Sequence, residues 1–156
     1  PALIWNRHRL GDDVTVDFEV SEYTEGYADG AHRHFPYHDV RVVVSGQEGQ
    51  AESGYAFVIG AEGGRRTVLL RNGVEVASSS DPRFRISMGS HCNSPRAVQV
   101  RATRHGGRLS LMLTGRVALE WEDREPLPAG QVGLGVAGCR ANFRDCVIYP
   151  DWTWES

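Results

Sequence analysis

Apolar and polar positions alternate along most of this chain, and the alternation is clearest between residues 106 and 123. Before the Thr114-Gly115 pair, leucines occupy every second position, at Leu109, Leu111 and Leu113. Beyond the pair, the apolar positions are Val117, Leu119 and Trp121. Because side chains two residues apart share one face of a strand, this stretch predicts a β-hairpin with one face in a core.

Short runs of the same kind recur elsewhere, separated by Gly, Asp, Asn, Ser and Pro, and helical periodicity is almost absent. β-Branched and aromatic residues fit a pleated, half-buried surface, whereas the separating residues favour turns. The pattern predicts an all-β fold, a two-sheet antiparallel β-sandwich. Strands are expected at residues 14–20, 40–45, 54–59, 66–71, 74–77, 83–87, 97–103, 109–114, 116–121, 131–136 and 143–149.

Two kinds of connection are expected between these strands. The pairs Gly63-Gly64, Asn72-Gly73 and Gly106-Gly107 tolerate positive φ and predict tight turns. Residues 21–38 are polar, aromatic and without a clean period, so we expect a long loop there. Long loops in compact domains are often functional.

Composition narrows the class of protein. A chain of 156 residues, 40% of them hydrophobic, predicts a single domain over residues 1–156. The net charge of −3 is spread along the chain, which argues against nucleic acid as a partner. No apolar run approaches the roughly 20 residues that cross a bilayer. All 17 basic residues are arginine, which excludes a Schiff-base or P-loop lysine.

The N-terminus and the cysteines indicate the kind of parent protein and the cellular compartment to expect. The N-terminus lacks an initiator Met and the basic and apolar regions of a signal peptide, so we expect a module excised or processed from a larger protein. We expect it to act in an extracellular or periplasmic setting. Cys92, Cys139 and Cys146 match no zinc spacing, and either one disulfide with a free thiol or three thiols is compatible with the sequence.

Six segments follow one another in a familiar order. They are residues 11–20 (GDDVTVDFEV), 53–60 (SGYAFVIG), 69–76 (LLRNGVEV), 98–109 (VQVRATRHGGRL), 130–136 (GQVGLGV) and 142–149 (NFRDCVIY). Together they resemble the concanavalin A-like lectin/glucanase superfamily, which includes laminin G-like modules and domains of bacterial sugar-processing proteins. The resemblance implies a jelly-roll sandwich and a tendency towards glycans. Arg144-Asp145 stands where Asp-Asn is common in that family, which weakens the case for a calcium site at that place.

Three carboxylates, Asp13, Asp17 and Glu19, fall on one face of the strand expected at residues 14–20. Retaining glycosidases need two carboxyl groups about 5–5.5 Å apart, and Cα atoms two apart on a strand are roughly 6.5–7 Å apart. If the chain is an enzyme, Asp17 and Glu19 are therefore the candidate acid/base and nucleophile. Laminarinase-type members of the superfamily carry a further glutamate, which this chain lacks. The other interpretation is the solvated side of a half-exposed strand.

A group of histidines lies in the predicted loop. His32 and His34 project to the same side of an extended segment, and His38 or Asp39 would supply a third ligand to a transition metal. The same residues would equally be solvated or contact a ligand hydroxyl.

Aromatic and polar residues are mixed in the same loop. A sugar ring binds through an apolar C–H face and an edge of hydroxyls, so its site combines aromatic planes with hydrogen-bonding side chains. Alternatively, the rings pin the loop to the edge of the sandwich. The candidate ligand-binding residues are Tyr23, Glu25, Tyr27, Asp29, His32, Arg33, His34 and Tyr37. A calcium ion, plausible for the superfamily, would take Asp29 or Asp39 as oxygen ligands.

The tryptophans divide into two groups. Trp121 is in phase with the apolar face of its strand and is expected in the core, and Trp5 is expected at the margin of the sandwich. Trp152 and Trp154 either cap the core or contact a neighbouring domain.

Three functions fit these observations. The leading one is a non-catalytic carbohydrate-binding module that uses residues 21–39. The alternatives are a glycoside-cleaving enzyme of the same fold and a laminin G-like interaction or assembly module. No nucleophile elbow, phosphate-binding loop, dinucleotide-binding glycine pattern or zinc-protease motif is present.

Overall fold

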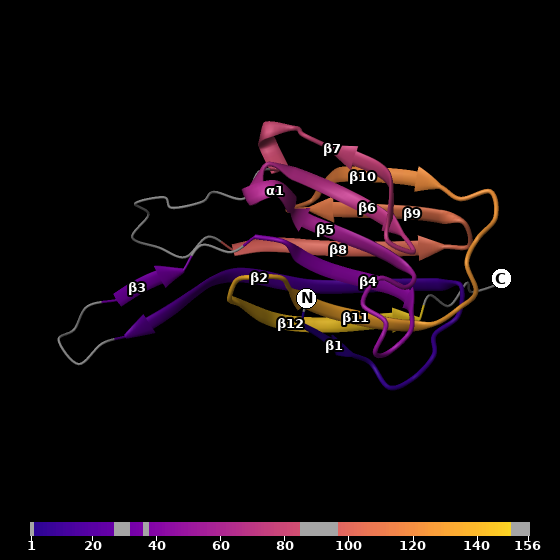
Figure 1. The fold of residues 1–156 in the computed structure, drawn as a ribbon, viewed down its shortest axis with the longest axis horizontal. Coiled ribbons are helices and arrows are strands. Elements are labelled where there is room, and N and C mark those ends of the chain that lie inside the picture. The colour runs from indigo at the N-terminus through magenta and orange to yellow at the C-terminus, as the bar shows by residue number, and fades with distance from the viewer. Residues whose placement is uncertain (1, 27–31, 36–37, 85–96, 151–156) are drawn as a thin grey trace.

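The computed structural model describes residues 2–26, 32–35, 38–84 and 97–150, with the backbone alone at residues 22–26 and 32–35. In this part of the chain nearly all regular structure is β-strand (Figure 1). The strands are β1 (Ala2–Trp5), β2 (Asp13–Gly26), β3 (His32–Phe35), β4 (Val40–Gly46), β5 (Tyr55–Gly60), β6 (Arg66–Arg71), β7 (Val74–Ser79), β8 (Ala97–His105), β9 (Arg108–Leu113), β10 (Arg116–Glu122), β11 (Gln131–Val136) and β12 (Ala141–Pro150). A helical turn, α1 (Ala61–Gly64), and a 3₁₀ turn, Pro82–Phe84, complete the set.

The strands form two antiparallel sheets. A six-stranded sheet has the order β1-β11-β4-β5-β6-β7, and the other has the order β10-β9-β8-β2-β12, with β3 paired to the far half of β2. The sheets are stacked, and the edge strand β10 lies against β7 and β6. The two-sheet antiparallel sandwich predicted from the sequence is confirmed.

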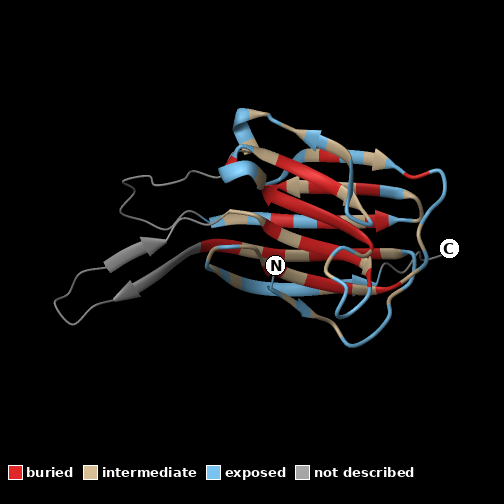
Figure 2. Ribbon diagram, viewed as in Figure 1, coloured by how far each residue is buried: buried red, intermediate tan, exposed pale blue. Residues whose placement is uncertain are grey.

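The core lies between the sheets and is built from the alternating positions. Leu109, Leu111 and Leu113 on β9 are buried, as predicted, and they belong to one cluster with apolar side chains of the six-stranded sheet. Figure 2 shows the buried stretches of the strands in red. The inward residues of β2 and β5 lie in the same cluster: Val14, Val16, Phe18, Val20, Tyr55, Phe57 and Ile59. Burial of these two facing layers supplies the main favourable term for folding.

Two strands were not predicted. β1 is held against β11 with Trp5 opposite Gly133. A methyl group at Gly133 or Gly46 would meet the Trp5 ring at 2.9 or 2.7 Å, so both glycines allow the ring to lie flat on the sheet. Trp5 thus packs at the sandwich margin, as expected. The second unpredicted strand is β3.

The long loop expected at residues 21–38 is wrong in its described parts. β2 continues through Gly26 and pairs antiparallel with β3, so the chain forms a hairpin that projects beyond the sandwich in Figure 1. Strand-forming residues such as Tyr23 and Phe35 stand opposite each other in this register. The strands were not predicted because polar and aromatic residues are mixed in residues 21–38 without a regular alternation.

The strand expected at residues 83–87 is also wrong where it is described. Pro82 has no N–H to donate to a ladder, and the chain turns at Asp81. The Asp81 carboxylate accepts the backbone N–H of Arg83 at 3.0 Å, and the Asp81 carbonyl accepts that of Phe84 at 3.0 Å. Local side-chain bonding of this kind competes with strand formation.

Val117 was expected to face the core, and the structure contradicts this. Val117 pairs with Met112, but Leu119 pairs with Leu111, so a β-bulge inserts one residue at Ala118. The extra residue reverses the alternation, and Val117 is 50% exposed while Leu119 is buried. Trp121, beyond the bulge, packs against the core as predicted, although it is only partly buried.

A tight turn occurs at Asn72-Gly73, as predicted, and another joins the two strands of the predicted hairpin at Thr114-Gly115. Asn72 and Gly73 have φ of 46° and 82°, and Thr114 and Gly115 have φ of 49° and 77°. Two successive positive φ values are typical of the type I′ hairpin turn, whose twist matches that of the strands.

Candidate functional site

The carboxylates predicted to share one face of β2 do so, on the outer side of the five-stranded sheet. Arg101 on β8 lies opposite Asp17 and donates from Nε and Nη2 to its two oxygens at 2.7 and 2.8 Å. Gln99 lies opposite Glu19 and donates from Nε2 at 2.6 Å. The arrangement is that of the solvated face of a strand. The catalytic roles of Asp17 and Glu19 stay a prediction.

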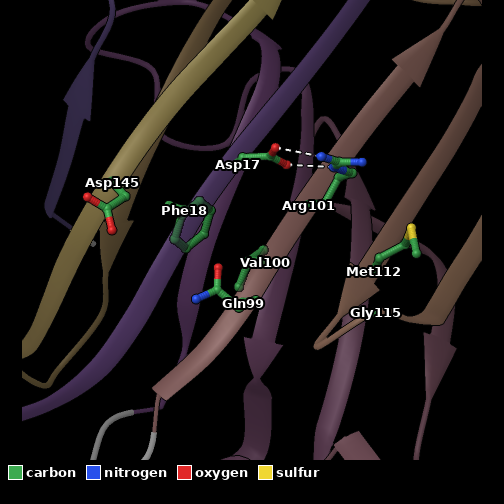
Figure 3. A pocket seen from close by; sticks show the side chains of 8 residues that line it. All are labelled: Asp17, Phe18, Gln99, Val100, Arg101, Met112, Gly115 and Asp145. Carbon is green, nitrogen blue, oxygen red and sulfur yellow. Dashed lines mark hydrogen bonds and ion pairs between the residues drawn. The ribbon is translucent and has the colours of Figure 1, made fainter.

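A groove of about 230 Å³ opens on this outer face (Figure 3). Its polar groups come from three strands. Its floor is formed by buried core residues, and a half-buried methionine on β9 supplies an apolar side chain. The lining residues are Asp17, Phe18, Gln99, Val100, Arg101, Met112, Gly115 and Asp145. An apolar surface bordered by a few hydrogen-bonding groups is the usual composition of a small-ligand site.

Asp145 reaches the groove because β12 bulges there. Arg144 pairs with Glu19, but the next paired residue is Val147, opposite Asp17, so β12 contains one extra residue. Asp145 takes a φ of 53°, a left-handed conformation that aspartate tolerates better than most residues. Among the described side chains its carboxylate has neither a hydrogen-bond nor an ion-pair partner, unlike Asp17 and Glu19, which are engaged by β8.

Some of the candidate ligand-binding residues lie on the β2–β3 hairpin, and the others lie outside the residues that the structure describes. Tyr23 and Glu25 stand on β2, and His32, Arg33 and His34 stand on β3, with Arg33 opposite Glu25 in the backbone register. Tyr27, Asp29 and Tyr37 lie outside the described residues. The structure therefore brings five of these positions together in one ribbon.

Of the predicted metal ligands, only His38 and Asp39 have side chains that the structure describes. The Asp39 carboxylate accepts a hydrogen bond from Nε of Arg41 at 3.0 Å and so forms an ion pair. The backbone N–H of His38 is directed at the sulfur of Cys139, 3.5 Å away. In the ranges 2–21, 38–84 and 97–150, no three His, Cys, Asp or Glu side chains are grouped so as to hold a metal ion. Calcium at Asp29 or Asp39 and a metal at His32 and His34 stay predictions.

Two of the cysteines are free thiols, Cys139 and Cys146, so no disulfide joins them. Cys139 is half-buried and donates to the carbonyl of His38 at 3.0 Å. Burial raises the pKa of the Cys139 thiol, which disfavours the reactive thiolate. This contact ties the β11–β12 connection to the base of the hairpin. Cys92, Trp152 and Trp154 lie outside the described residues.

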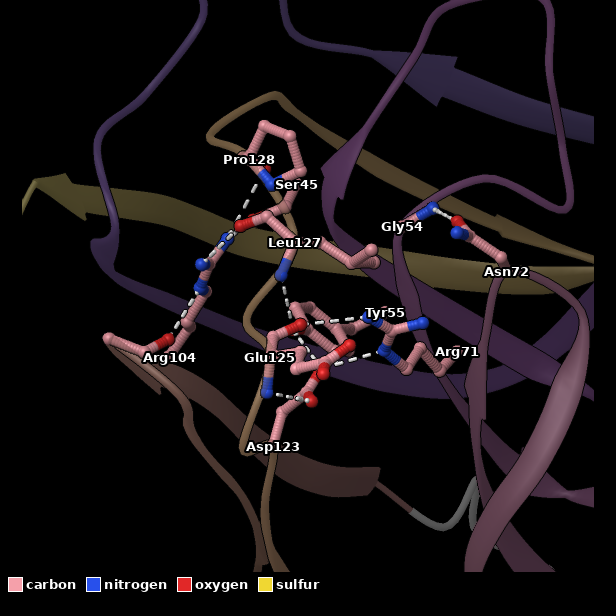
Figure 4. Close-up of polar contacts among 11 residues, drawn as sticks. Ser45, Gly54, Tyr55, Arg71, Asn72, Arg104, Asp123, Glu125, Leu127 and Pro128 are labelled. Atoms are coloured by element: carbon pink, nitrogen blue, oxygen red, sulfur yellow. Dashed lines mark hydrogen bonds and ion pairs between the residues drawn. The ribbon is translucent and has the colours of Figure 1, made fainter.

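A buried polar cluster around Arg104, Tyr55 and Asp123 was not predicted from the sequence (Figure 4). Arg104 is 1% exposed and its guanidinium lies 5.3 Å from the centre of the Tyr55 ring. It donates to the carbonyls of Gly106 and Leu127 at 2.7 and 2.6 Å, and to the hydroxyl of Ser45. The sequence did contain a signal that Arg104 is buried, because its position in β8 continues the inward-facing series of Val100 and Ala102.

Asp123 forms the second half of this cluster. Its carboxylate accepts the Tyr55 hydroxyl at 2.6 Å, Nε of Arg71 at 2.7 Å and the backbone N–H of Glu125 at 2.9 Å. The Tyr55 hydroxyl in turn accepts the backbone N–H of Leu127 at 2.8 Å. These bonds fasten the segment after β10 across the end of the sandwich, so the cluster has a structural role.

No helix in the described ranges is both long enough and apolar enough to cross a membrane.

Comparison with known proteins defines the class of fold. The sequence matches no protein-family model and no curated protein. Solved structures match at probability 1.00. The carbohydrate-binding module CBM66 from Bacillus subtilis superposes with a TM-score of 0.66 and 15% identity, over 94% of this chain and 80% of that one. The chain thus has the jelly-roll β-sandwich fold that the resemblance implied.

Two further structures are lectins of the same type. The Ca²⁺- and mannose-bound exoplasmic/lumenal domain of VIP36 has a TM-score of 0.63 and 12% identity, over 99% of this chain and 75% of that one. A toad ovary galectin in complex with thio-digalactose has a TM-score of 0.55 and 14% identity, over 95% and 97% of the two chains. At these identities the likeness concerns the fold, because one fold supports many functions.

Proposed function

We propose that this chain is a non-catalytic carbohydrate-binding module whose ligand surface is the groove of Figure 3 together with the β2–β3 hairpin. The jelly-roll lectin fold supports this, since solved structures that share it include a carbohydrate-binding module and two sugar-bound lectins.

The single observation that carries the proposal is the carboxylate of Asp145, which has no partner among the described side chains and lies at the edge of a groove with an apolar side. A sugar hydroxyl donates to a carboxylate in a charge-assisted hydrogen bond, which is stronger than a neutral one. The Gln99 amide oxygen and the Asp17–Arg101 pair supply further acceptors and donors. Met112 offers its thioether and methyl group to the C–H face of the ring.

β2 connects the groove to the hairpin without interruption. Tyr23 and Glu25 occupy the same alternation class along β2 as Asp17 and Glu19, counted from the sequence. The distance along the strand from Asp17 to Glu25 is roughly 26 Å at the usual rise per residue. A surface of that length suits an extended oligosaccharide better than a single sugar. In this proposal Tyr27, Asp29, His32, Arg33, His34 and Tyr37 complete the hydrogen-bonding and stacking set.

A glycan array probed with the purified chain, with and without EDTA, tests the proposal and the calcium expectation together. Titration calorimetry with the best oligosaccharide then measures affinity for the variants Tyr27→Ala, Tyr37→Ala and Asp145→Asn. We expect each to weaken binding about tenfold, the loss of one stacking or charge-assisted contact. Loss of binding in EDTA would favour calcium at Asp29 or Asp39.

Matched controls come from the same molecule. Tyr149→Ala removes an exposed tyrosine opposite Thr15, at the far end of β2 from the hairpin. Glu122→Gln neutralises an exposed carboxylate on the edge strand β10. Both should bind as the unmodified chain does. Binding that survives in all three test variants would exclude the proposed surface, and release of shorter saccharides that stops in Asp17→Asn and Glu19→Gln would identify an enzyme instead.

A further inference from the structure

A second cavity, of about 340 Å³, lies at the end of the sandwich near the tip of the β9–β10 hairpin. It is separate from the groove of Figure 3 and shares no lining residue with it. Its walls come from both sheets. The residues that carry the argument are Ile59, Phe84, Val98, Leu113, Arg83 and Arg116.

One wall of this cavity is formed by apolar side chains, although its accessible lining as a whole is about as polar as it is apolar. Ile59 on β5 and Leu113 on β9 belong to the buried core and present its outer end. Val98 on β8 and Phe84 in the 3₁₀ turn pack partly buried against the same core. This wall offers transfer free energy to an apolar group, while Thr114 and the two arginines supply the polar part of the lining.

The rim of the cavity is cationic. The Arg83 guanidinium lies 5.5 Å from the centre of the Phe84 ring and forms a salt bridge with Asp81 at 2.7 Å. Arg116 makes no hydrogen bond or salt bridge with any described side chain. Its charge adds to that of Arg83 in lowering the pKa of the Asp81 carboxyl, which places the three groups in one electrostatic neighbourhood. Among the described residues, two cations and one anion leave a net positive charge at the mouth.

We propose that this cavity binds a small amphipathic monocarboxylate, with its apolar body against Ile59, Leu113, Val98 and Phe84 and its carboxylate at Arg116. The guanidinium presents a planar set of donors that fits a carboxylate in two parallel hydrogen bonds. Arg116 is the anchor, because Arg83 is already held by Asp81. This site is independent of carbohydrate binding.

The size of the cavity sets the length of the acid. An apolar cavity of about 150 Å³ accommodates a benzene ring. By that measure about 340 Å³ accommodates an unbranched body of roughly eight carbons with its end at the mouth. Octanoate is therefore the probe of choice. Octanol and octyltrimethylammonium have the same chain with a neutral or cationic head.

Titration calorimetry of the whole chain with these three probes at low salt tests the proposal. Octanoate should bind saturably with one site, octanol about tenfold more weakly, and octyltrimethylammonium not at all. In Arg116→Gln, octanoate should lose about tenfold while octanol is unchanged. Arg108→Gln, which removes another exposed arginine of the same sheet, should leave both affinities as they were.

A substitution that fills the cavity tests the predicted contact between its apolar wall and the hydrocarbon chain of the probe. Val98→Phe should abolish binding of octanoate and octanol alike, while the variant's thermal transition and its glycan binding report that the fold is intact. Equal affinity for octanoate and octanol, or equal effects of Arg116→Gln and Arg108→Gln, would overturn the assignment. So would the absence of saturable octanoate binding by the unmodified chain, whatever the outcome of the glycan experiments.

Discussion

Arg104 shows, at the scale of one residue, how a charge is accommodated at the inner face of a sheet. Strand alternation directs it inward, where an unpaired guanidinium would be costly. The carbonyls of Gly106 and Leu127 and the Tyr55 ring surround it. The Asp12 carboxylate lies 3.7 Å from Nη2 and forms a salt bridge with it. The cluster therefore stabilises the fold only while all of its members are present.

Replacing Arg104 with methionine should lower the free energy of unfolding by about 3 kcal/mol, because buried acceptors lose their donor. The control is Arg101→Met on the same strand, whose side chain is 56% exposed and paired with Asp17. That change should cost less than about 1 kcal/mol. Urea denaturation of the two variants measures both values, and equal losses would contradict the structural role of the cluster.

Asp123 and Tyr55 give this cluster a defined pH response. Burial raises the pKa of the Asp123 carboxyl, but hydrogen bonds from Tyr55 and Arg71 outweigh burial, and the net pKa is lowered. Such a group stabilises the fold above its unfolded pKa of about 3.9, and the contribution is lost as pH falls through the folded pKa. For Tyr55, burial and then the bond to Asp123 raise the pKa.

The tyrosine contribution is complete below its unfolded pKa of about 10 and is lost as pH rises through the folded value. Asp123→Asn should therefore flatten the acid decline of the unfolding free energy, and Tyr55→Phe should flatten the alkaline decline. Denaturant titrations across the pH range measure both slopes. If the unfolding free energy of Tyr55→Phe still falls at alkaline pH as steeply as that of the unmodified chain, groups other than Tyr55 cause the alkaline decline.

At the scale of elements, turns and bulges decide where the alternation holds. Asn72-Gly73 and Thr114-Gly115 form turns of the same kind, but only the first has a residue suited to positive φ at its first position. Thr114 is β-branched and is strained by a φ of 49°.

Thr114→Asn should raise the free energy of unfolding by about 0.5–1 kcal/mol, because asparagine tolerates the left-handed conformation. Thr114→Val, which keeps the branch and lacks the hydroxyl, serves as the control and should not stabilise. The thermal midpoints of the two variants provide the measurement. A lower midpoint for Thr114→Asn would mean that the turn is not strained.

The same elements show what alternation does and does not reveal. The leucines of β9 were placed correctly because no bulge interrupts that strand. Val117 was misplaced because a bulge depends on tertiary pairing and has no local signature. Asp145 was not predicted as a groove residue for the same reason. Two of the acceptors of Arg104 lie 23 and 24 residues further along the chain, which no local pattern reveals.

At the scale of the whole molecule, two apolar layers hold the sandwich together. Phe57 lies at the centre of the six-stranded sheet with no exposed surface. Phe57→Ala should cost about 3–5 kcal/mol through lost burial and the cavity left behind. Val117→Ala, at a position 50% exposed, should change stability by less than about 0.5 kcal/mol. Urea midpoints compare them, and similar costs would argue against the packing described for β5 and β10.

β2 belongs both to the sandwich and to the hairpin that projects from it, and this has a mechanical consequence. Along its first half it is bonded to β8 on one side and β12 on the other. Those bonds run across the strand direction. Tension applied at the hairpin along β2 would load the two ladders simultaneously in shear rather than unzip them one bond at a time, so the domain should resist pulling in this direction far better than across it.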